Sequence, residues 1–149
     1  MTDEFYIQKA IEQAKRALSK DEVPIGCVIV LDGKIIASAY NLKERRNDAT
    51  NHAEMLAIKK ASKKIKSWRL NDCVMYVTLE PCLMCYGAIL NARIKRVVYG
   101  AKDSKNSAFL HNVENVNLNH KAEHFFLQTD ECSKILTEYF QSKREGNQT

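Results

Sequence analysis

Two cysteines three positions apart, Cys82 and Cys85, are the first residues whose spacing suggests chemistry. They follow Pro81, which suits the first position of a helix because its missing N–H has no intrahelical partner there. The spacing would place both sulfur atoms on one face of the helix's first turn, where the positive end of the helix favours thiolates. Redox pairs, structural zinc sites and pairs of simply buried cysteines share this spacing, so the pair alone does not decide between them.

A histidine and a glutamate lie thirty residues earlier, in the stretch Asn51-His52-Ala53-Glu54. With the two cysteines, His52 completes a set of three ligands, the number typical of a catalytic zinc site whose fourth position holds water. A structural site would need a fourth protein ligand, but no other histidine or cysteine has ligand-pair spacing with this set. Two simpler interpretations stay open: His52 as a core or capping residue, and Glu54 as the capping-box partner of Asn51.

This set of residues suits hydrolysis. Two thiolates neutralise Zn²⁺, and a water on the metal acidifies from a pKa of about 9 to about 7. Glu54 would lie near that water, take its proton and pass it on to the substrate, and such general acid–base catalysis accelerates a reaction about a hundred- to ten-thousand-fold. Desolvation would raise the pKa of the Glu54 carboxyl and nearby zinc would lower it, so the sequence leaves the direction open.

The elements that must position these residues alternate between helices and strands. Apolar residues at helical spacing predict a first helix that ends before Pro24. Asp32-Gly33 supplies the positive φ of a tight turn and predicts a hairpin from strands over 25–31 and 34–39. We further predict a polar loop over 40–51, helices over 52–64, 81–91 and 131–143, and strands over 74–79, 95–100 and 125–127. This order predicts an α/β fold, one domain over residues 1–149 with helices packed on a central sheet.

The composition is that of an ordinary globular chain of 149 residues, 45% hydrophobic and 28% charged, without an apolar run that could span a membrane. Its first residues, Met1-Thr2-Asp3-Glu4, are acidic where a signal peptide would be basic, so we expect a cytoplasmic protein. Five cysteines, an odd number, argue for free or metal-bound thiols and against a disulfide framework.

Basic side chains outnumber acidic ones by 23 to 18, which gives a net charge of +5. The excess is concentrated between Met55 and Asn71, a stretch without acidic residues that holds Lys59, Lys60, Lys63, Lys64, Lys66 and Arg69. This bias permits a polyanionic partner, although a solvated helix face is the simpler explanation.

The motif His52-Ala53-Glu54 followed by Pro81-Cys82-x-x-Cys85 resembles the signature of the zinc-dependent nucleobase deaminases, within the cytidine and deoxycytidylate deaminase superfamily. Over nearly the whole chain, the sequence is similar to one family among them, the bacterial tRNA-specific adenosine deaminases. The matching positions are Glu22–Gly26, Asn41, Asp48–Glu54, Thr78–Cys85, Gly100–Asp103 and Asn119–Lys121. Thr78–Cys85 is the most specific of them, because cytidine and guanine deaminases usually frame their cysteines with different neighbours.

The resemblance implies a cytidine-deaminase-like three-layer α/β/α sandwich with a central mixed sheet, and a homodimer. It also implies conversion of adenosine to inosine at the first anticodon position, the wobble position, within a tRNA anticodon stem-loop. His52, Cys82 and Cys85 would hold one Zn²⁺ per subunit, and Glu54 would be the proton shuttle.

The resemblance further assigns five substrate contacts. The main chain of Ala53 and the side chain of Asn41 would hold the flipped base, Ile25 and Leu79 would lie along its faces, and Asp103 would lie beside the ribose. Without the motif, Asn41 and Asp103 would be interpreted as turn residues, and Ile25 and Leu79 as core residues.

The chain departs from the family pattern at two places. After Lys105 the family usually continues with a glycine-rich loop of small residues, whereas this chain has Asn106-Ser107-Ala108-Phe109-Leu110, which could alter contacts to the RNA. The usual proline two residues before Asn51 is Ala49, which should only loosen a turn. The C-terminal Tyr139-Phe140 and Lys143-Arg144 resemble the aromatic and basic end that touches the anticodon stem in the family; core aromatics and a solvated tail would explain them as well.

Three hypotheses remain from the sequence. The first is an RNA-editing adenosine deaminase. The second is a deaminase of a free nucleobase or nucleoside, such as guanine or cytidine, which shares the zinc site and would turn over free nucleosides. The third is a non-catalytic, zinc-stabilised RNA-binding or dimerisation module, against which Glu54 argues because a structural site has no use for that carboxylate.

Overall fold

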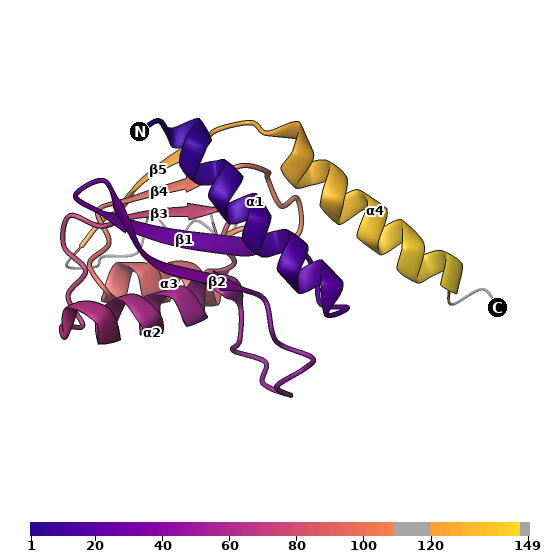
Figure 1. Cartoon of the computed structure of the whole chain (residues 1–149), viewed down its shortest axis with the longest axis horizontal. Helices are drawn as coiled ribbons and strands as arrows, with labels where there is room; N and C mark the ends of the chain where they lie inside the picture. The colour runs from indigo at the N-terminus through magenta and orange to yellow at the C-terminus, as the bar shows by residue number, and fades with distance from the viewer. Residues whose placement is uncertain (109–119, 147–149) are drawn as a thin grey trace.

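The structure, a computed structural model, describes residues 1–108 and 120–146. Its elements in chain order are α1 (Asp3–Ser19), β1 (Gly26–Leu31), β2 (Lys34–Tyr40), α2 (Ala53–Ile65), β3 (Val74–Val77), α3 (Leu83–Asn91), β4 (Arg96–Tyr99), β5 (Glu123–Phe126) and α4 (Asp130–Gly146). The sheet lies in the middle, with α1 crossing one face and α2 and α3 covering the other (Figure 1). The predicted α/β/α sandwich is confirmed.

The five strands form one mixed sheet in the order β2-β1-β3-β4-β5. β1 is antiparallel to both β2 and β3, whereas β3, β4 and β5 are parallel to one another. The predicted hairpin is present, with Asp32 and Gly33 at φ values of 51° and 76°. Because β3 and β4 are parallel, their carboxyl ends lie at one edge, so the segments that follow them, 78–82 and 100–108, run side by side.

Apolar side chains fill both faces of the sheet. Ile29, Met75 and Val97 point toward α2 and α3, and the alternating residues Val28 and Val98 belong to the cluster that packs under α1. α1 comes so close to β1 that a Cβ atom on Gly26 would lie 2.0 Å from the carbonyl oxygen of Ala10. The backbone of α1 therefore rests directly on the start of β1.

Some element boundaries differ from the predictions. β3 ends at Val77 and not at Leu79, and the next residue, Thr78, accepts a hydrogen bond from the Gly26 N–H through its hydroxyl at 3.1 Å. α3 begins at Leu83, so Pro81 lies outside the helix and Cys82 is its N-cap. β5 begins at Glu123, two residues before the predicted strand. Within the described ranges, no helix combines the length and hydrophobicity needed to cross a bilayer.

Candidate active site

Two helix N-termini meet at the predicted metal ligands. His52 is the N-cap of α2 and Cys82 the N-cap of α3, both with extended backbone, while Cys85 lies in the first turn of α3. Neither cap residue uses its side chain to cap its helix. The imidazole and the Cys82 thiol are therefore free to face the same point in space.

The three side chains form a compact group. His52 Nδ1 lies 3.6 Å from Cys82 Sγ and 3.4 Å from Cys85 Sγ. A tetrahedral Zn²⁺ with bonds of about 2.0 Å to nitrogen and about 2.3 Å to sulfur would separate the nitrogen from each sulfur by about 3.5 Å. In the part of the chain that the structure describes, this is the one group of three or more potential metal ligands with atoms within 4.8 Å of one another. The donor set therefore fits a metal site with three protein ligands.

Hydrogen bonding differentiates the two thiols. The Cys85 thiol donates toward Cys82 and lowers the pKa of Cys82 to about 4, while that same interaction and burial raise the pKa of Cys85. The Cys82 thiolate in turn raises the pKa of His52. A cation bound between them would replace these protons and favour two thiolates and a neutral imidazole.

Glu54 lies one residue inside α2 and is 4% exposed. Burial is the main reason that the pKa of its carboxyl rises from 4.5 to about 7. Because the N-cap of α2 is His52 and not Asn51, Glu54 is not at the capping-box position. A carboxyl group with a pKa near neutrality can both accept and return a proton, which is the property required of a general acid–base.

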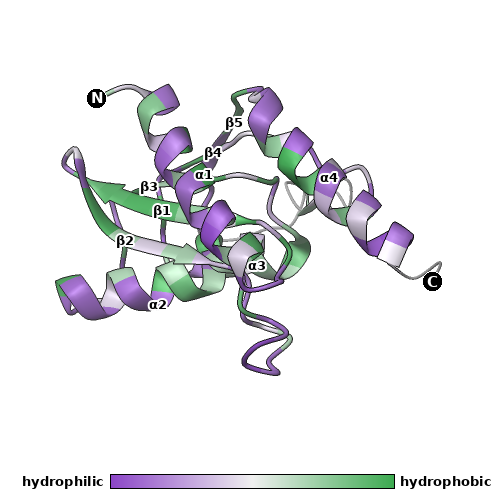
Figure 2. Ribbon diagram, turned by 45° about the vertical axis from the view of Figure 1, so that its right-hand side comes forward, coloured by the Kyte–Doolittle hydropathy of each residue, from purple (hydrophilic) through white to green (hydrophobic). Residues whose placement is uncertain are grey.

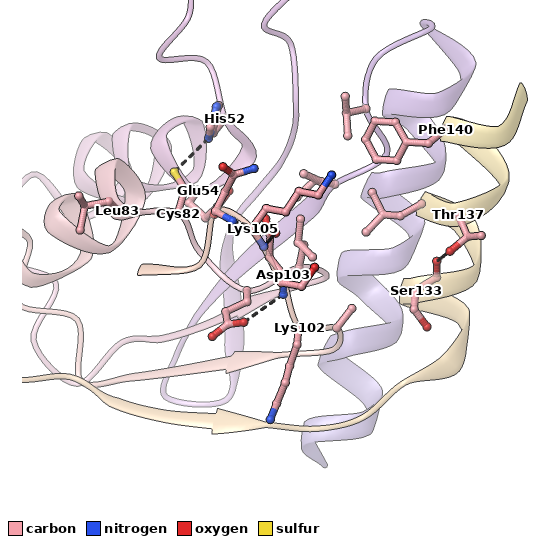
Figure 3. Close-up of a pocket in the computed structure, with 18 of the residues that line it drawn as sticks. His52, Glu54, Cys82, Leu83, Lys102, Asp103, Lys105, Ser133, Thr137 and Phe140 are labelled. Carbon is pink, nitrogen blue, oxygen red and sulfur yellow. Dashed lines mark hydrogen bonds between the residues drawn. The ribbon is translucent and has the colours of Figure 1, made fainter. Parts of the chain in front are cut away.

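Three of these residues, His52, Glu54 and Cys82, line one side of a cleft of about 1000 Å³, whereas Cys85 is buried behind it. Figure 3 shows His52, Glu54 and Cys82 on one side and Ser133, Thr137 and Phe140 of α4 on the other, with Lys102, Asp103 and Lys105 between them. This volume is at the upper end of the range for small-molecule sites. The cleft has room for more than a single base.

The predicted substrate residues divide into two groups. Ile25, Leu79 and Asp103 line the cleft. Asn41 and Ala53 are buried and do not line it. The Asn41 side-chain oxygen has no hydrogen-bond partner within the described residues, although it is buried. Asp103 also caps a turn, since its carboxylate accepts hydrogen bonds from the backbone N–H groups of Lys105 and Asn106.

The basic and aromatic stretches singled out in the sequence lie in different places. Phe140, Lys143 and Arg144 line the cleft, and Phe140 is 46% exposed, so it is no core aromatic. The basic residues between Lys59 and Arg69 are all exposed and none of them lines the cleft. In the divergent loop 104–112, Ser107 forms a β-bridge with Cys82, whereas residues 109–112 lie outside the described part.

Two buried acids near the cleft received no role in the sequence interpretation. Glu80 is 7% exposed and accepts a hydrogen bond from the backbone N–H of Asp103 at 3.0 Å, so it joins the metal-site turn to the loop that lines the cleft. Glu22 is fully buried and holds the loop after β2. Both fall within stretches that match the family, but nothing in their spacing indicates which backbone they hold.

Comparison with known proteins agrees with this geometry. Residues 1–144 match the MafB19-like deaminase family. The chain is similar to the tRNA-specific adenosine deaminase of Bacillus subtilis (strain 168), with 42% identity over 96% of this chain and 91% of the relative.

Two solved structures are also similar. One comes from work on A-to-I editing by tRNA:A34 deaminases at the wobble position of transfer RNA. Its TM-score is 0.84 and its sequence is 39% identical, and the match covers 89% of this chain and 99% of the chain in that structure. A guanine deaminase from Bacillus subtilis has a TM-score of 0.68 and 32% identity, over 97% of this chain and 95% of its own.

Proposed function

The chain belongs to the tRNA-specific adenosine deaminase family, and from this premise we propose that it converts adenosine to inosine at the wobble position of a tRNA anticodon. The observation that carries the proposal is the convergence of His52, Cys82 and Cys85 beside the buried Glu54 at one wall of a large cleft. A free-base deaminase would use the same group, so the substrate has to be decided by the rest of the cleft.

The metal would be one Zn²⁺ per chain, held by His52, Cys82 and Cys85. The three-ligand set supports this, because catalytic zinc sites typically leave the fourth position to water. When bound, zinc supplies the Lewis acidity that makes water nucleophilic at neutral pH.

Glu54 would move the protons of the reaction. Water adds to C6 of the adenine, the C6–N bond breaks, and ammonia leaves as inosine forms. The Glu54 carboxylate takes a proton from the attacking water and delivers it to the ring nitrogen N1. It then takes the proton of the hydroxyl group now on C6 and passes it to the amine, so that the exocyclic C6–N6 bond breaks and ammonia leaves. The raised pKa of Glu54, about 7, supports this role, because a carboxyl group with that pKa can both accept and release a proton near neutral pH.

The remaining family-implied residues would hold the flipped nucleoside. The side-chain oxygen of Asn41 is buried and has no hydrogen-bond partner among the described residues. Because a buried polar atom without a partner destabilises the fold, a substrate N–H or O–H that donates to this oxygen would bind favourably. Ile25 and Leu79 would flank the base, Ala53 would contact it through its main chain, and Asp103 would lie beside the ribose. Ile25, Leu79 and Asp103 line the cleft, which supports their roles, and Ala53 lies between the cleft-lining residues His52 and Glu54 in the sequence.

We also propose that residues 1–149 form a single deaminase domain that acts as a homodimer. The dimer is proposed by family membership alone. Light scattering at micromolar concentration should give a mass about twice the 17.0 kDa of one chain.

The direct test is incubation of the purified, zinc-loaded protein with unmodified tRNA, followed by nucleoside analysis of the anticodon. Inosine should form at the first anticodon position and nowhere else in the tRNA. Unchanged tRNA, together with rapid release of ammonia from guanine, would instead assign the protein the activity of its guanine deaminase relative.

A further inference from the structure

Glu22 is a carboxylate in a buried position, where a charge loses its hydration. It lies between α1 and β1 with an exposed fraction of 0%. One carboxylate oxygen accepts a hydrogen bond from the Glu44 N–H at 2.9 Å and the other from the Arg45 N–H at 2.7 Å. No basic side chain of the described residues forms an ion pair with it. Because burial of an uncompensated charge is costly, its two backbone hydrogen bonds are what make this placement tolerable.

Those two N–H groups belong to a loop rich in cations, residues 43–47, which we call the cationic loop; its basic residues are Lys43, Arg45 and Arg46. The loop is closed at its base by the Leu42 N–H, which donates to the Asn51 carbonyl at 3.0 Å. All of residues 43–47 are exposed, and the segment between β2 and α2 projects from the body as a hydrophilic loop (Figure 2). Among the described residues, none of the three cations forms an ion pair.

The turn that carries Glu22 also connects the cationic loop to the cleft. Asp21 forms an ion pair with Lys143 at 2.6 Å, and Lys143 lines the cleft from α4. Val23, on the other side of Glu22, lines the cleft as well. At its far end, the loop leads through Asn51 directly into the metal-site residue His52. The cationic loop is therefore joined to cleft-lining segments from two directions, through the Glu22 turn and through Asn51 to His52.

We propose that Glu22 is a positioning residue for RNA binding: its buried carboxylate fixes the cationic loop so that the three basic side chains of this loop meet the phosphates of the bound RNA. The inference rests on the proposed function and extends it, because it assigns part of the RNA affinity to one carboxylate that touches neither substrate nor metal. A glutamine at this position would turn an N–H donor toward one of the two loop N–H groups, so it cannot replace the carboxylate.

The test compares five zinc-loaded proteins on an anticodon stem-loop RNA at several salt concentrations. They are wild type, Glu22→Gln, a neutral-loop variant with Lys43→Ala, Arg45→Ala and Arg46→Ala, the combination of these four changes, and Glu12→Gln as a control. We expect the neutral-loop variant to raise KM at least about tenfold and to flatten its salt dependence, because each lost phosphate contact removes about 0.7 from the slope for single-stranded RNA. Glu22→Gln should raise KM about three- to tenfold and change kcat less than about twofold. Glu12→Gln, which removes an exposed carboxylate on α1, should change neither constant.

The combination distinguishes positioning from a general loss of structure. If Glu22 acts through the cationic loop, Glu22→Gln should raise KM less than about twofold in the neutral-loop background, because coupled residues are not additive. An equal increase in both backgrounds, or a fall in kcat at constant KM, overturns the proposal. If Glu22→Gln does not fold, Glu22→Asp takes its place with the same expectations. A wild-type protein that converts no stem-loop counts against the proposed function itself, whereas an active wild type with an unaltered Glu22→Gln counts only against the positioning role.

Discussion

The pKa values of single residues at this site are changed by hydrogen bonding and burial at the starts of two helices. His52 and Cys82 end extended segments at the positive ends of α2 and α3, where the first backbone N–H groups of a helix favour negative charge. Glu54 lies one residue further in and is buried, which opposes its ionisation and raises its pKa to about 7. The Cys82 thiol and the Glu54 carboxyl thus lie at neighbouring helix N-termini, and their pKa values change in opposite directions.

Glu54→Gln should keep the metal and the fold and lose nearly all turnover. Glutamine has nearly the same shape but cannot accept and return a proton, so we expect a fall in kcat of about a hundred- to ten-thousand-fold. Zinc content by atomic absorption and the rate of inosine formation should be measured on the same preparation. A variant that has lost its zinc would mean that Glu54 is a ligand, and one with a near-normal rate would remove Glu54 from the mechanism.

Cys82→Ser and Cys85→Ser should each lose the metal and lower the melting temperature. The three proposed ligands lie at the starts of α2 and α3, so a metal bound between them would add its binding free energy to the free energy of unfolding. Thermal melts of the wild type with and without a chelator provide the comparison. An unchanged melting temperature after verified removal of zinc would show that the metal contributes nothing to the fold.

At the scale of elements, the sequence was sufficient wherever a local pattern decides the structure. Helical spacing predicted α1, Asp32-Gly33 predicted the hairpin, and the element order predicted a central sheet with helices packed on it. The start of α3 was predicted less accurately. Pro81 suits the first position of a helix, but in the structure its carbonyl accepts a hydrogen bond from the distant Ala108 N–H and the helix begins at Leu83. The contacts of Glu22 and Glu80 also depend on segments distant in the chain, and no local pattern encodes them.

Gly26→Ala should destabilise the protein because α1 leaves no space for a side chain. A Cβ atom would lie 2.0 Å from the Ala10 carbonyl oxygen and 2.5 Å from the Ala14 nitrogen, and both are backbone atoms that cannot rotate away. We expect a loss of at least about 2 kcal/mol in the free energy of unfolding and a fall in Tm of about 5 °C or more. Gly87→Ala is the matched control: it lies in α3 with no atom within 4 Å of the new Cβ, so it should raise stability by about 0.5–1 kcal/mol. Equal stability of the two variants would contradict the close packing of α1 on β1.

The start of α1 should respond to pH through Asp3. Its carboxylate accepts two hydrogen bonds from Arg96, at 2.9 and 3.2 Å, and these hold the pKa of Asp3 below its ordinary value of 3.8. A lowered carboxyl pKa stabilises the fold fully above the unfolded value of 3.8, and this contribution is lost as the pH falls through the lower folded value. Since the pair is partly exposed, we expect at most about 1 kcal/mol between wild type and Asp3→Asn at pH 7. Urea unfolding from pH 7 to pH 2 should show the two curves converging only at the acidic end, and a constant difference would contradict the assignment.

Over the whole molecule, the placement of charge matters more than its total. The net charge of +5 is moderate, and the longest basic stretch, on and after α2, lies away from the cleft. The basic residues that line the cleft come from two separate segments, Lys102 and Lys105 after β4 and Lys143 and Arg144 on α4. The Lys102 ammonium group lies 5.0 Å from the centroid of the Phe126 ring. A cleft of about 1000 Å³ bordered by such cations fits a base that remains attached to its phosphodiester chain better than a free base.

The substrate should therefore be a folded RNA hairpin and not a free nucleoside. Flipping a base out of its stack costs a few kcal/mol, least for a loop nucleotide that is already partly unstacked, and contacts to the neighbouring phosphates must offset that cost. An anticodon stem-loop with adenosine at the first anticodon position should be converted far faster than free adenosine at equal concentration. Its KM should rise with salt, with a slope set by the number of phosphates contacted. Lys102→Ala combined with Lys105→Ala should flatten that slope while zinc content stays unchanged. Comparable efficiency on free adenosine, guanine or cytidine would assign the protein to the small-molecule deaminases, and salt-independent turnover of RNA would contradict the role given to the cations around the cleft.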